Sequence, residues 1–376
     1  MKHLKHLSFA ALLIAPVIAC GGSNKADTVQ PEQPVAQAPV AKEEPPAKPP
    51  AKKIPDGFFT LTPQLTVRGV DQAVDFYVKA LGAEKVMVMP GPDGKAMHAE
   101  IRVGDSIIML DEENVAQGMK SPLALGGTNG SLLVYVDDTD AAFARIVDAG
   151  AQAEMPPEDM FWGDRYATVV DPFGHRWAVA THLEDLTPEQ MQQRAELLFP
   201  PKGKKAPKAK KGEPAWKKIA GAPATAKKPA EYHTVTPAYT LADTAALIDF
   251  YKAAFGANEI SRMPMPDGKI MHAEIQIGDS RLMLTDEDPK MGNKSAKTLG
   301  GSAMAMHLYT EDVDGVFAQA KGAKAIELMP VETVFWGDRY GALVDPAGIM
   351  WGIATHVEDV TPEEMAERMK AQMAAS

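Results

Sequence analysis

The chain carries one sequence twice, with a constant offset of 174 positions between the copies. Because the offset does not drift, the two copies contain no net insertion relative to each other between their landmarks. A period of this size exceeds the roughly 20–50 residues of a solenoid repeat. It predicts two globular domains in tandem, each long enough to bury its own core. The repeated landmarks are Asp75-Phe76-Tyr77 and Asp249-Phe250-Tyr251, Met97-His98-Ala99-Glu100 and Met271-His272-Ala273-Glu274, Gly104-Asp105-Ser106 and Gly278-Asp279-Ser280, and Phe161-Trp162-Gly163-Asp164-Arg165-Tyr166 and Phe335-Trp336-Gly337-Asp338-Arg339-Tyr340.

Residues 1–20 are typical of the signal peptide of a bacterial lipoprotein. A positively charged start and an apolar stretch over 7–18 precede the lipobox Val17-Ile18-Ala19-Cys20. Such a segment is removed and does not remain as a membrane span. Cys20 is the only cysteine, so no internal disulfide can form. We therefore expect a mature protein anchored by lipid on Cys20 in the bacterial cell envelope, on the outer membrane and facing the periplasm, because Gly21 follows the cysteine.

Two segments of Pro, Ala and Lys divide the rest of the chain. Residues 21–56 indicate an extended tether, because they contain almost no large apolar side chain. Residues 201–230 hold ten lysines and one acidic residue, which favours a self-repelling spacer; the alternative is a lipid-contacting linker with Trp216 as its interfacial anchor. The two domains are expected at 57–200 and 231–376. We expect a monomer and, for an exported protein, no nucleic-acid partner.

Each copy shows the alternation and turn chemistry of two similar α+β halves. Apolar residues recur at helical spacing before Gly82 and before Gly150, and alternate over the flanking segments. The order predicted for each copy is therefore βαβββ followed by βαβββ. In the first copy we expect strands at 61–67, 84–89, 97–103, 106–110, 131–136, 151–155, 166–170 and 176–182, with helices at 71–81 and 139–148.

This order and three phrases resemble the vicinal oxygen chelate superfamily, which includes glyoxalase I, fosfomycin- and bleomycin-resistance proteins and extradiol dioxygenases. The phrases are Asp75-Phe76-Tyr77 with Leu81-Gly82-Ala83, Met97-His98-Ala99-Glu100, and Asp171-Pro172-Phe173-Gly174-His175. The resemblance covers 57–195 and 231–372. It implies an α+β fold of two tandem domains, in which paired βαβββ modules form a cup-shaped mixed sheet that holds a metal ion or a small ligand.

The usual metal ligands of that superfamily are expected to be missing. A divalent ion needs about three or four His, Asp or Glu donors, and none of the corresponding positions carries one. We therefore predict no metal at this site and no cofactor. The positions are Thr62, Met109, Ser131 and Ala178 in the first copy, and Thr236, Met283, Ala305 and Gly352 in the second.

The repeated His-x-Glu pairs indicate a different possible site. His98 and Glu100 share one face of a strand, and His182 ends the last strand of the copy. Three roles remain: a divalent metal held by two histidines and one carboxylate, acid–base groups or polar contacts around an organic ligand, or a hydrogen bond in the sheet. The second copy repeats the set as His272, Glu274 and His356.

A second constellation combines aromatic, acidic and guanidinium groups. Arg165 is expected to clamp a carboxylate or phosphate, with Trp162 stacking on the ligand; the alternative is an Asp-Arg pair that fixes the loop. The expected ligand contacts are Trp162, Asp164, Arg165 and His182 in the first copy, and Trp336, Asp338, Arg339 and His356 in the second.

Two functions follow from this sequence. The favoured one is binding of a small organic molecule in each cup, because none of the usual metal positions carries a side chain that could coordinate a metal ion. The alternative is a glyoxalase-like lyase or isomerase that acts on a small oxygenated compound with His98, Glu100, His272 and Glu274. The sequence leaves open whether any reaction is catalysed, and shows no fingerprint of serine hydrolases, P-loops, zincins or dinucleotide-binding folds.

Overall fold

The structure is a computed structural model that describes residues 51–375 apart from 92, 201–213 and 266. The expected signal peptide, Cys20 and nearly all of the tether lie outside these residues. Within them, no helix is both long and apolar enough to cross a membrane.

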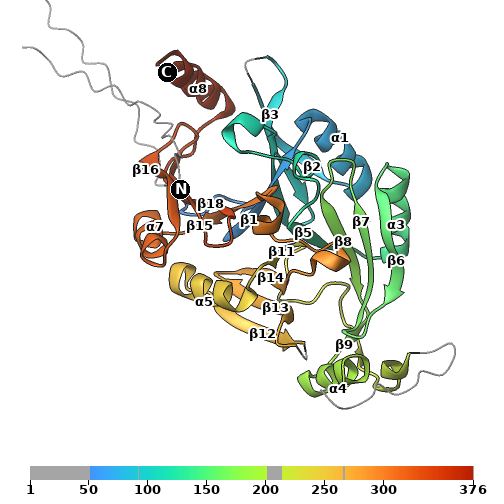
Figure 1. Cartoon of the computed structure of the whole chain (residues 1–376). Coiled ribbons are helices and arrows are strands. Elements are labelled where there is room, and N and C mark those ends of the chain that lie inside the picture. The colour runs from blue at the N-terminus through green and yellow to red at the C-terminus, as the bar shows by residue number, and fades with distance from the viewer. Residues whose placement is uncertain (1–50, 92, 201–213, 266, 376) are drawn as a thin grey trace, which may run out of the picture. The chain divides into compact units, whose positions relative to one another are not determined.

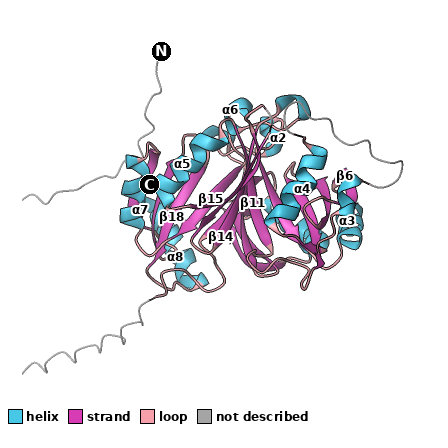
Figure 2. Ribbon diagram, turned by 90° about the horizontal axis from the view of Figure 1, so that it is seen from below, coloured by secondary structure: helices cyan, strands magenta, loops and turns pink. Residues whose placement is uncertain are grey.

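The described chain forms two eight-stranded mixed sheets flanked by helices (Figures 1 and 2). The first sheet has the order β16-β17-β18-β15-β1-β4-β3-β2 and the second has the order β12-β13-β14-β11-β5-β8-β7-β6. This is the expected α+β class of paired βαβββ modules. The strands of the first sheet are β1 (Leu61–Val67), β2 (Glu84–Pro90), β3 (Ala96–Val103), β4 (Ser106–Glu112), β15 (Met304–Tyr309), β16 (Ile326–Thr333), β17 (Asp338–Val344) and β18 (Met350–His356). Those of the second are β5 (Gly130–Tyr135), β6 (Gln152–Asp159), β7 (Asp164–Val170), β8 (Arg176–His182), β11 (Val235–Leu241), β12 (Asn258–Pro264), β13 (Ile270–Ile277) and β14 (Ser280–Asp286).

Each sheet combines one module from each copy, because β1 pairs with β15 and β11 pairs with β5, both antiparallel. The blue β1 therefore lies beside the orange β15 in Figure 1. The fold class is as expected, with the difference that the two modules of one sheet come from different copies. The physical reason is that the copies offer the same pairing edge, so the sequence pattern fits either partner.

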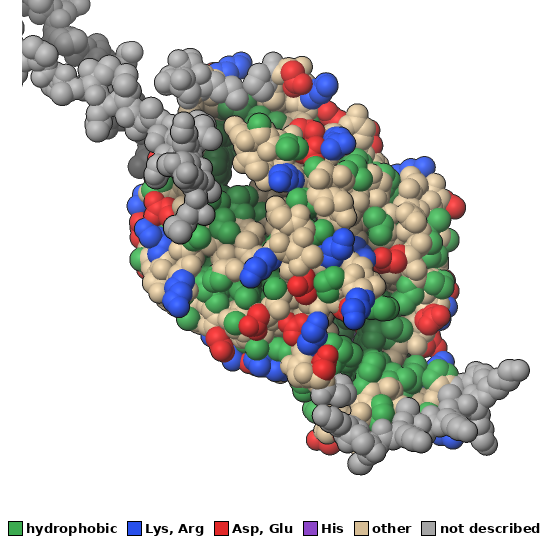
Figure 3. All heavy atoms as spheres, in the orientation of Figure 1, with side chains coloured by type: hydrophobic (Ala, Val, Ile, Leu, Met, Phe, Trp, Pro, Cys, Tyr) green, Lys and Arg blue, Asp and Glu red, His purple; other side chains and the backbone are tan. Residues whose placement is uncertain are grey.

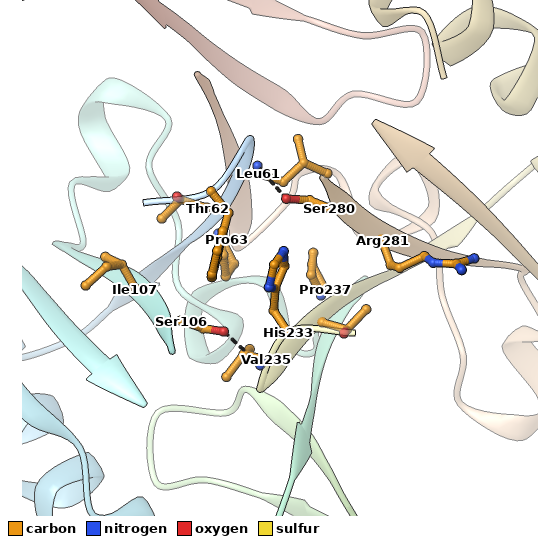
Figure 4. Close-up of a pocket in the computed structure, with 12 residues that line it drawn as sticks. Leu61, Thr62, Pro63, Ser106, Ile107, His233, Val235, Pro237, Ser280 and Arg281 are labelled. Atoms are coloured by element: carbon orange, nitrogen blue, oxygen red, sulfur yellow. Dashed lines mark hydrogen bonds between the residues drawn. The ribbon is translucent and has the colours of Figure 1, made fainter. Parts of the chain in front are cut away.

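A repeated turn holds the exchanged strands in place. The Ser106 hydroxyl accepts a hydrogen bond from the backbone N–H of Val235 at 3.0 Å, and the Ser280 hydroxyl accepts one from Leu61 at 3.1 Å (Figure 4). Thr234 approaches Gly104 so closely that a Cβ there would collide with it, and Gly104 has φ +60°. The repeated Gly-Asp-Ser landmark is thus a contact between copies.

The helices keep the two modules of one copy together. Helix α1 (Val70–Leu81) packs on α3 (Thr139–Asp148), and α5 (Thr244–Phe255) packs on α7 (Val313–Gly322). Gly82, in the left-handed conformation, ends α1. These helices and the strand residues that alternate toward them form one continuous hydrophobic core. We call the opposite side of each sheet its inner face.

Shorter elements complete the chain. Trp216 in η2 (Ala215–Lys218) is only 5% exposed, because it packs against the buried Arg194 of α4 (Pro188–Leu198). The guanidinium carbon of Arg194 lies 5.0 Å from the centre of the Trp216 ring. The interfacial-anchor hypothesis for Trp216 is therefore wrong. The remaining elements are η1 (Val115–Gln117), α2 (Pro122–Leu125), β9 (Glu184–Asp185), α4 (Pro188–Leu198), η2 (Ala215–Lys218), β10 (Ala222–Pro223), η3 (Pro289–Met291), α6 (Ala296–Leu299) and α8 (Pro362–Ala375). On the face seen in Figure 3, acidic and basic side chains are interspersed.

Candidate functional site

The inner face of the first sheet carries a group of polar side chains from three adjacent strands. His98 on β3 lies opposite Asp111 on β4, and its Nδ1 is 2.7 Å from an Asp111 carboxylate oxygen. The amide of Gln64 on β1 donates to the other oxygen of Asp111. Glu100 lies 4.0 Å from His98 Nε2. Alternation along each strand places these four side chains on one face.

The second copy contributes His307 to the same face. His307 lies on β15 opposite Thr62 and is only 5% exposed. Its ring centre is 4.5 Å from that of Tyr309 and 5.7 Å from that of Tyr340. In the part of the chain that the structure describes, its Nε2 has no hydrogen-bond partner. A buried polar atom without a partner is rare in folded proteins and marks a place where a further group is needed. We call Gln64, His98, Glu100, Asp111 and His307 the inner-face cluster.

The pKa values of two histidines in the cluster are shifted in opposite directions. Burial alone would lower the pKa of His98, but the adjacent carboxylates of Asp111 and Glu100 outweigh it and raise the pKa to about 10. Burial lowers the pKa of His307, although Asp338 and Glu100 oppose the shift. At neutral pH the cluster therefore combines an imidazolium at His98 with a neutral imidazole at His307.

The inner face of the second sheet differs at the equivalent positions. Leu133 replaces His307, Thr285 replaces Asp111 and Ala238 replaces Gln64. Leu133 belongs to a small apolar cluster with Tyr135, Ala178 and Ala180, against which Tyr166, Tyr232 and Met283 pack. The duplication has thus preserved the scaffold while the two inner faces have changed.

The structure brings only part of the predicted His-Glu-His sets together. His98 and Glu100 are neighbours on the first sheet, and His272 and Glu274 lie 3.1 Å apart on the second. His182, however, lies on the second sheet and not with His98, because the modules are exchanged. Among the described residues, no three His, Cys, Asp or Glu side chains are arranged to hold a metal ion.

The two strand-end histidines are held within the protein. His182 Nδ1 is 2.7 Å from Asp164, and His356 Nδ1 is 2.8 Å from Asp338. Hydrogen bonding to Asp164 raises the pKa of His182 to about 9. Burial would lower the pKa of His356, but Asp338 outweighs it and the pKa rises. Each Asp also accepts a bond from a tyrosine hydroxyl: Tyr135 for Asp164 and Tyr309 for Asp338.

Both predicted arginine clamps are bound by the protein's own carboxylates. Arg165 forms a two-pronged pair with Asp140 and also contacts Asp159 at 3.0 Å. Arg339 forms the same two-pronged pair with Asp314. These contacts match the alternative in which the arginine fixes its loop.

The neighbouring tryptophans also make contacts within the protein. Trp162 packs edge-on against Phe161 and Tyr166, and the Trp336 indole N–H donates to Asp338 at 3.1 Å.

Sequence reasoning missed three members of the cluster. Gln64 and Asp111 lie outside the repeated phrases, and His307 is not repeated, because its counterpart in the first copy is Leu133. The available signal was positional, because Asp111 lies on the same strand face as His98 once β3 and β4 are paired as a hairpin.

The two mixed sheets of paired βαβββ modules define a class of protein, and two stretches of sequence identify it. Residues 60–179 and 233–353 match the family described as the Glyoxalase/Bleomycin resistance protein/Dioxygenase superfamily. These matches cover more than half of the chain, which therefore belongs to this superfamily.

Individual relatives cover one copy or show the fold alone. The uncharacterized protein Rv0887c of Mycobacterium tuberculosis is 42% identical over 136 residues, which are 35% of this chain and 79% of the relative. The protein At5g48480 of Arabidopsis thaliana is 28% identical over 123 residues, or 31% of this chain and 74% of the relative. The structure of glyoxalase I from Zea mays is similar with a TM-score of 0.50 and 14% identity, over 83% of this chain and 94% of that one.

Proposed function

We propose that this glyoxalase-like protein binds a small organic molecule, and that the first sheet's inner face is the principal binding surface. The observation that carries the proposal is the unpartnered Nε2 of the buried His307 beside Glu100 and Asp111. A ligand hydroxyl or amine would supply the missing hydrogen bond, and its binding would offset the cost of burying that nitrogen.

The family's usual metal positions do not suit a divalent ion. The exchange of modules groups Thr62 and Met109 with Ala305 and Gly352 on the first sheet. It groups the corresponding Ser131, Ala178, Thr236 and Met283 on the second. Neither set contains an imidazole or a carboxylate, which are the donors that hold such ions. The proposed binding is therefore metal-independent, and near-stoichiometric Ni, Zn, Mn or Fe in purified protein would contradict it.

Native mass spectrometry of the purified protein, together with a thermal-shift screen of small polar compounds, tests the binding proposal. The His307→Leu and Asp111→Thr variants install residues that the second sheet already accommodates at the equivalent positions, Leu133 and Thr285. They are expected to lose a retained or added ligand, whereas His272→Gln on the other sheet is the matched control and keeps it. Retention of ligand by both first-sheet variants would place the binding elsewhere.

A second candidate function is favoured by the opposite pKa shifts of His98 and His307. A protonated and a neutral imidazole on the same face of one sheet suit metal-independent proton transfer in a small oxygenated substrate. Incorporation of solvent deuterium into dihydroxyacetone tests this lyase or isomerase hypothesis. Exchange that His307→Leu abolishes would support catalysis, and exchange no faster than in buffer would exclude it for this probe.

The same proposal places the protein on the cell envelope through lipid on Cys20. Metabolic labelling with a palmitate analogue checks this expectation. Cys20→Ser should abolish the label and release the protein from the membrane fraction, and an unlabelled, membrane-free wild type would refute it.

A further inference from the structure

Two equivalent glutamates on the inner faces have very different surroundings. On the second sheet, the Glu274 carboxylate receives the Tyr232 hydroxyl at 2.6 Å, His272 Nε2 at 3.1 Å and Arg281 Nη1 at 3.5 Å. The Arg281 guanidinium also lies over the Tyr232 ring, 5.5 Å from its centre. Burial alone would raise the pKa of Glu274, but these donors outweigh it and lower the pKa. The second copy thus satisfies its own carboxylate with a cation and a hydroxyl.

On the first sheet, Glu100 has lost both of those donors. Ile107 stands at the position of Arg281, and Phe58 stands at the position of Tyr232. Figure 4 shows Ile107 and Arg281 on opposite sides of the junction between the copies, at equivalent places. Phe58 keeps the placement of the aromatic ring, since it packs edge-on against Tyr309 at 5.4 Å, as Tyr232 does against Tyr135 at 5.7 Å. The substitutions therefore remove the donors and keep the aromatic wall.

The remaining partner of Glu100 is weak. His98 Nε2 lies 4.0 Å from the Glu100 carboxylate, and the other nitrogen of that ring is engaged with Asp111. The Glu100 side chain is only 15% exposed, so its charge is poorly hydrated but still reachable. With His98 protonated, the two carboxylates of the cluster leave one net negative charge. A partly buried charge without a matched partner is unfavourable.

We propose that the first sheet binds one small organic cation, a guanidinium or primary ammonium compound, with its charged group on Glu100 where the Arg281 guanidinium lies on Glu274 in the second sheet. This inference rests on the proposed binding function and specifies its ligand class. The second sheet binds none, because its own arginine occupies the equivalent carboxylate.

Apolar groups beside Glu100 indicate the rest of the ligand. Met87 and Met109 lie directly opposite Glu100 on the two neighbouring strands, so all three side chains share the inner face. Methionine side chains adapt to varied apolar shapes. An aromatic ring such as that of Phe58 attracts a cation placed over it, as Arg281 lies over Tyr232 in the second sheet. The unpartnered His307 nitrogen lies on the same face. A ligand with a cationic head and a compact apolar or aromatic body fits these contacts.

Calorimetric titration with phenylguanidine and its neutral isostere phenylurea tests the ligand class. We expect one phenylguanidine per chain and binding of phenylurea weaker by about 10- to 100-fold, the range that a charge-assisted hydrogen bond supplies. Glu100→Gln should remove the preference, and Glu274→Gln is the matched control that keeps it. Equal affinity for both probes would overturn the cation assignment while leaving small-molecule binding intact.

A second pair of variants tests the internal comparison directly. Ile107→Arg installs the cation of the second sheet and should abolish phenylguanidine binding without loss of cooperative unfolding. The double variant Arg281→Ile with Tyr232→Phe should raise the stoichiometry from one to two. Undiminished binding by a folded Ile107→Arg protein, or no phenylguanidine binding by the wild type, would overturn the inference. The broader proposal of small-molecule binding is tested independently by the ligand screen of the purified protein.

Discussion

Replacing Asp171 by alanine tests how the two sheets are tied together through the helix layer. This buried carboxylate accepts bonds from the Tyr77 hydroxyl at 2.7 Å, the Trp177 indole at 2.9 Å, and the backbone N–H groups of Phe173 and His175 at 2.9 Å each. Tyr77 belongs to α1 and Trp177 to β8 of the second sheet, so the bonds join the two modules of one copy. Burial and the neighbouring Asp171 raise the pKa of Tyr77, which keeps its hydroxyl protonated.

The expected loss of stability follows from the donors left behind. Each buried donor without a partner costs about 1–3 kcal/mol, and the two backbone groups in the turn can partly recover by hydration. We therefore expect Asp171→Ala to lower the free energy of unfolding by about 3–5 kcal/mol. Tyr77→Phe removes one donor from a carboxylate that keeps three, and should cost about 1–2 kcal/mol.

Urea denaturation followed by far-UV circular dichroism measures both changes. Asp140→Ala is the control, because its ion pair with Arg165 is exposed and should contribute less than about 1 kcal/mol. Asp345→Ala in the other copy should match Asp171→Ala, since Asp345 accepts the equivalent bonds from Tyr251 and Trp351. A loss below about 1 kcal/mol for Asp171→Ala would refute the reasoning.

Four further outcomes are expected. The pKa of His98 rises from 6.5 to about 10, so the protonated His98 stabilises the fold fully below pH 6.5, and this contribution disappears as the pH approaches 10. NMR titration should show an imidazolium at pH 8. The His98→Gln variant should lose more stability at pH 6.5 than at pH 10. The pKa of His307 is lowered, so the same spectra should show it neutral at pH 7. Gly104→Val should destabilise the junction with Thr234, whereas Gly118→Ala, with open space around it, should cost less by calorimetry. Trp216→Ala should expose α4 to proteolysis and leave the sheets intact, because Trp216 packs on α4; equal protease resistance would contradict this.

Elements with a strong periodic pattern could be predicted closely. The helix expected at 71–81 spans Val70–Leu81, because its apolar stripe and its glycine stop are both local signals. The strand expected at 151–155 instead runs over Gln152–Asp159 and includes two prolines. It is an edge strand, where a missing N–H need not break the ladder.

The exchange of modules and most of the site could not be predicted. Which copy supplies the partner of β1 depends on three-dimensional contacts such as those of Ser106 and Ser280, and both copies offer the same chemistry. The His98–Glu100 pair was found because it recurs. Asp111 and His307 were missed because they are not repeated in the other copy. A search for repeats gives weight only to residues that both copies share.

The pairing of β1 with β15 and of β5 with β11 has a consequence for how such a gene can change. Deleting either repeat would leave the survivor with two half-sheets, each of which would need the complementary half-sheet of a second chain. Within the single chain the two repeats therefore depend on each other for folding, whereas selection on ligand recognition needs only one of the surfaces. The other surface is then free to accumulate substitutions such as Leu133 and Arg281 without loss of the architecture.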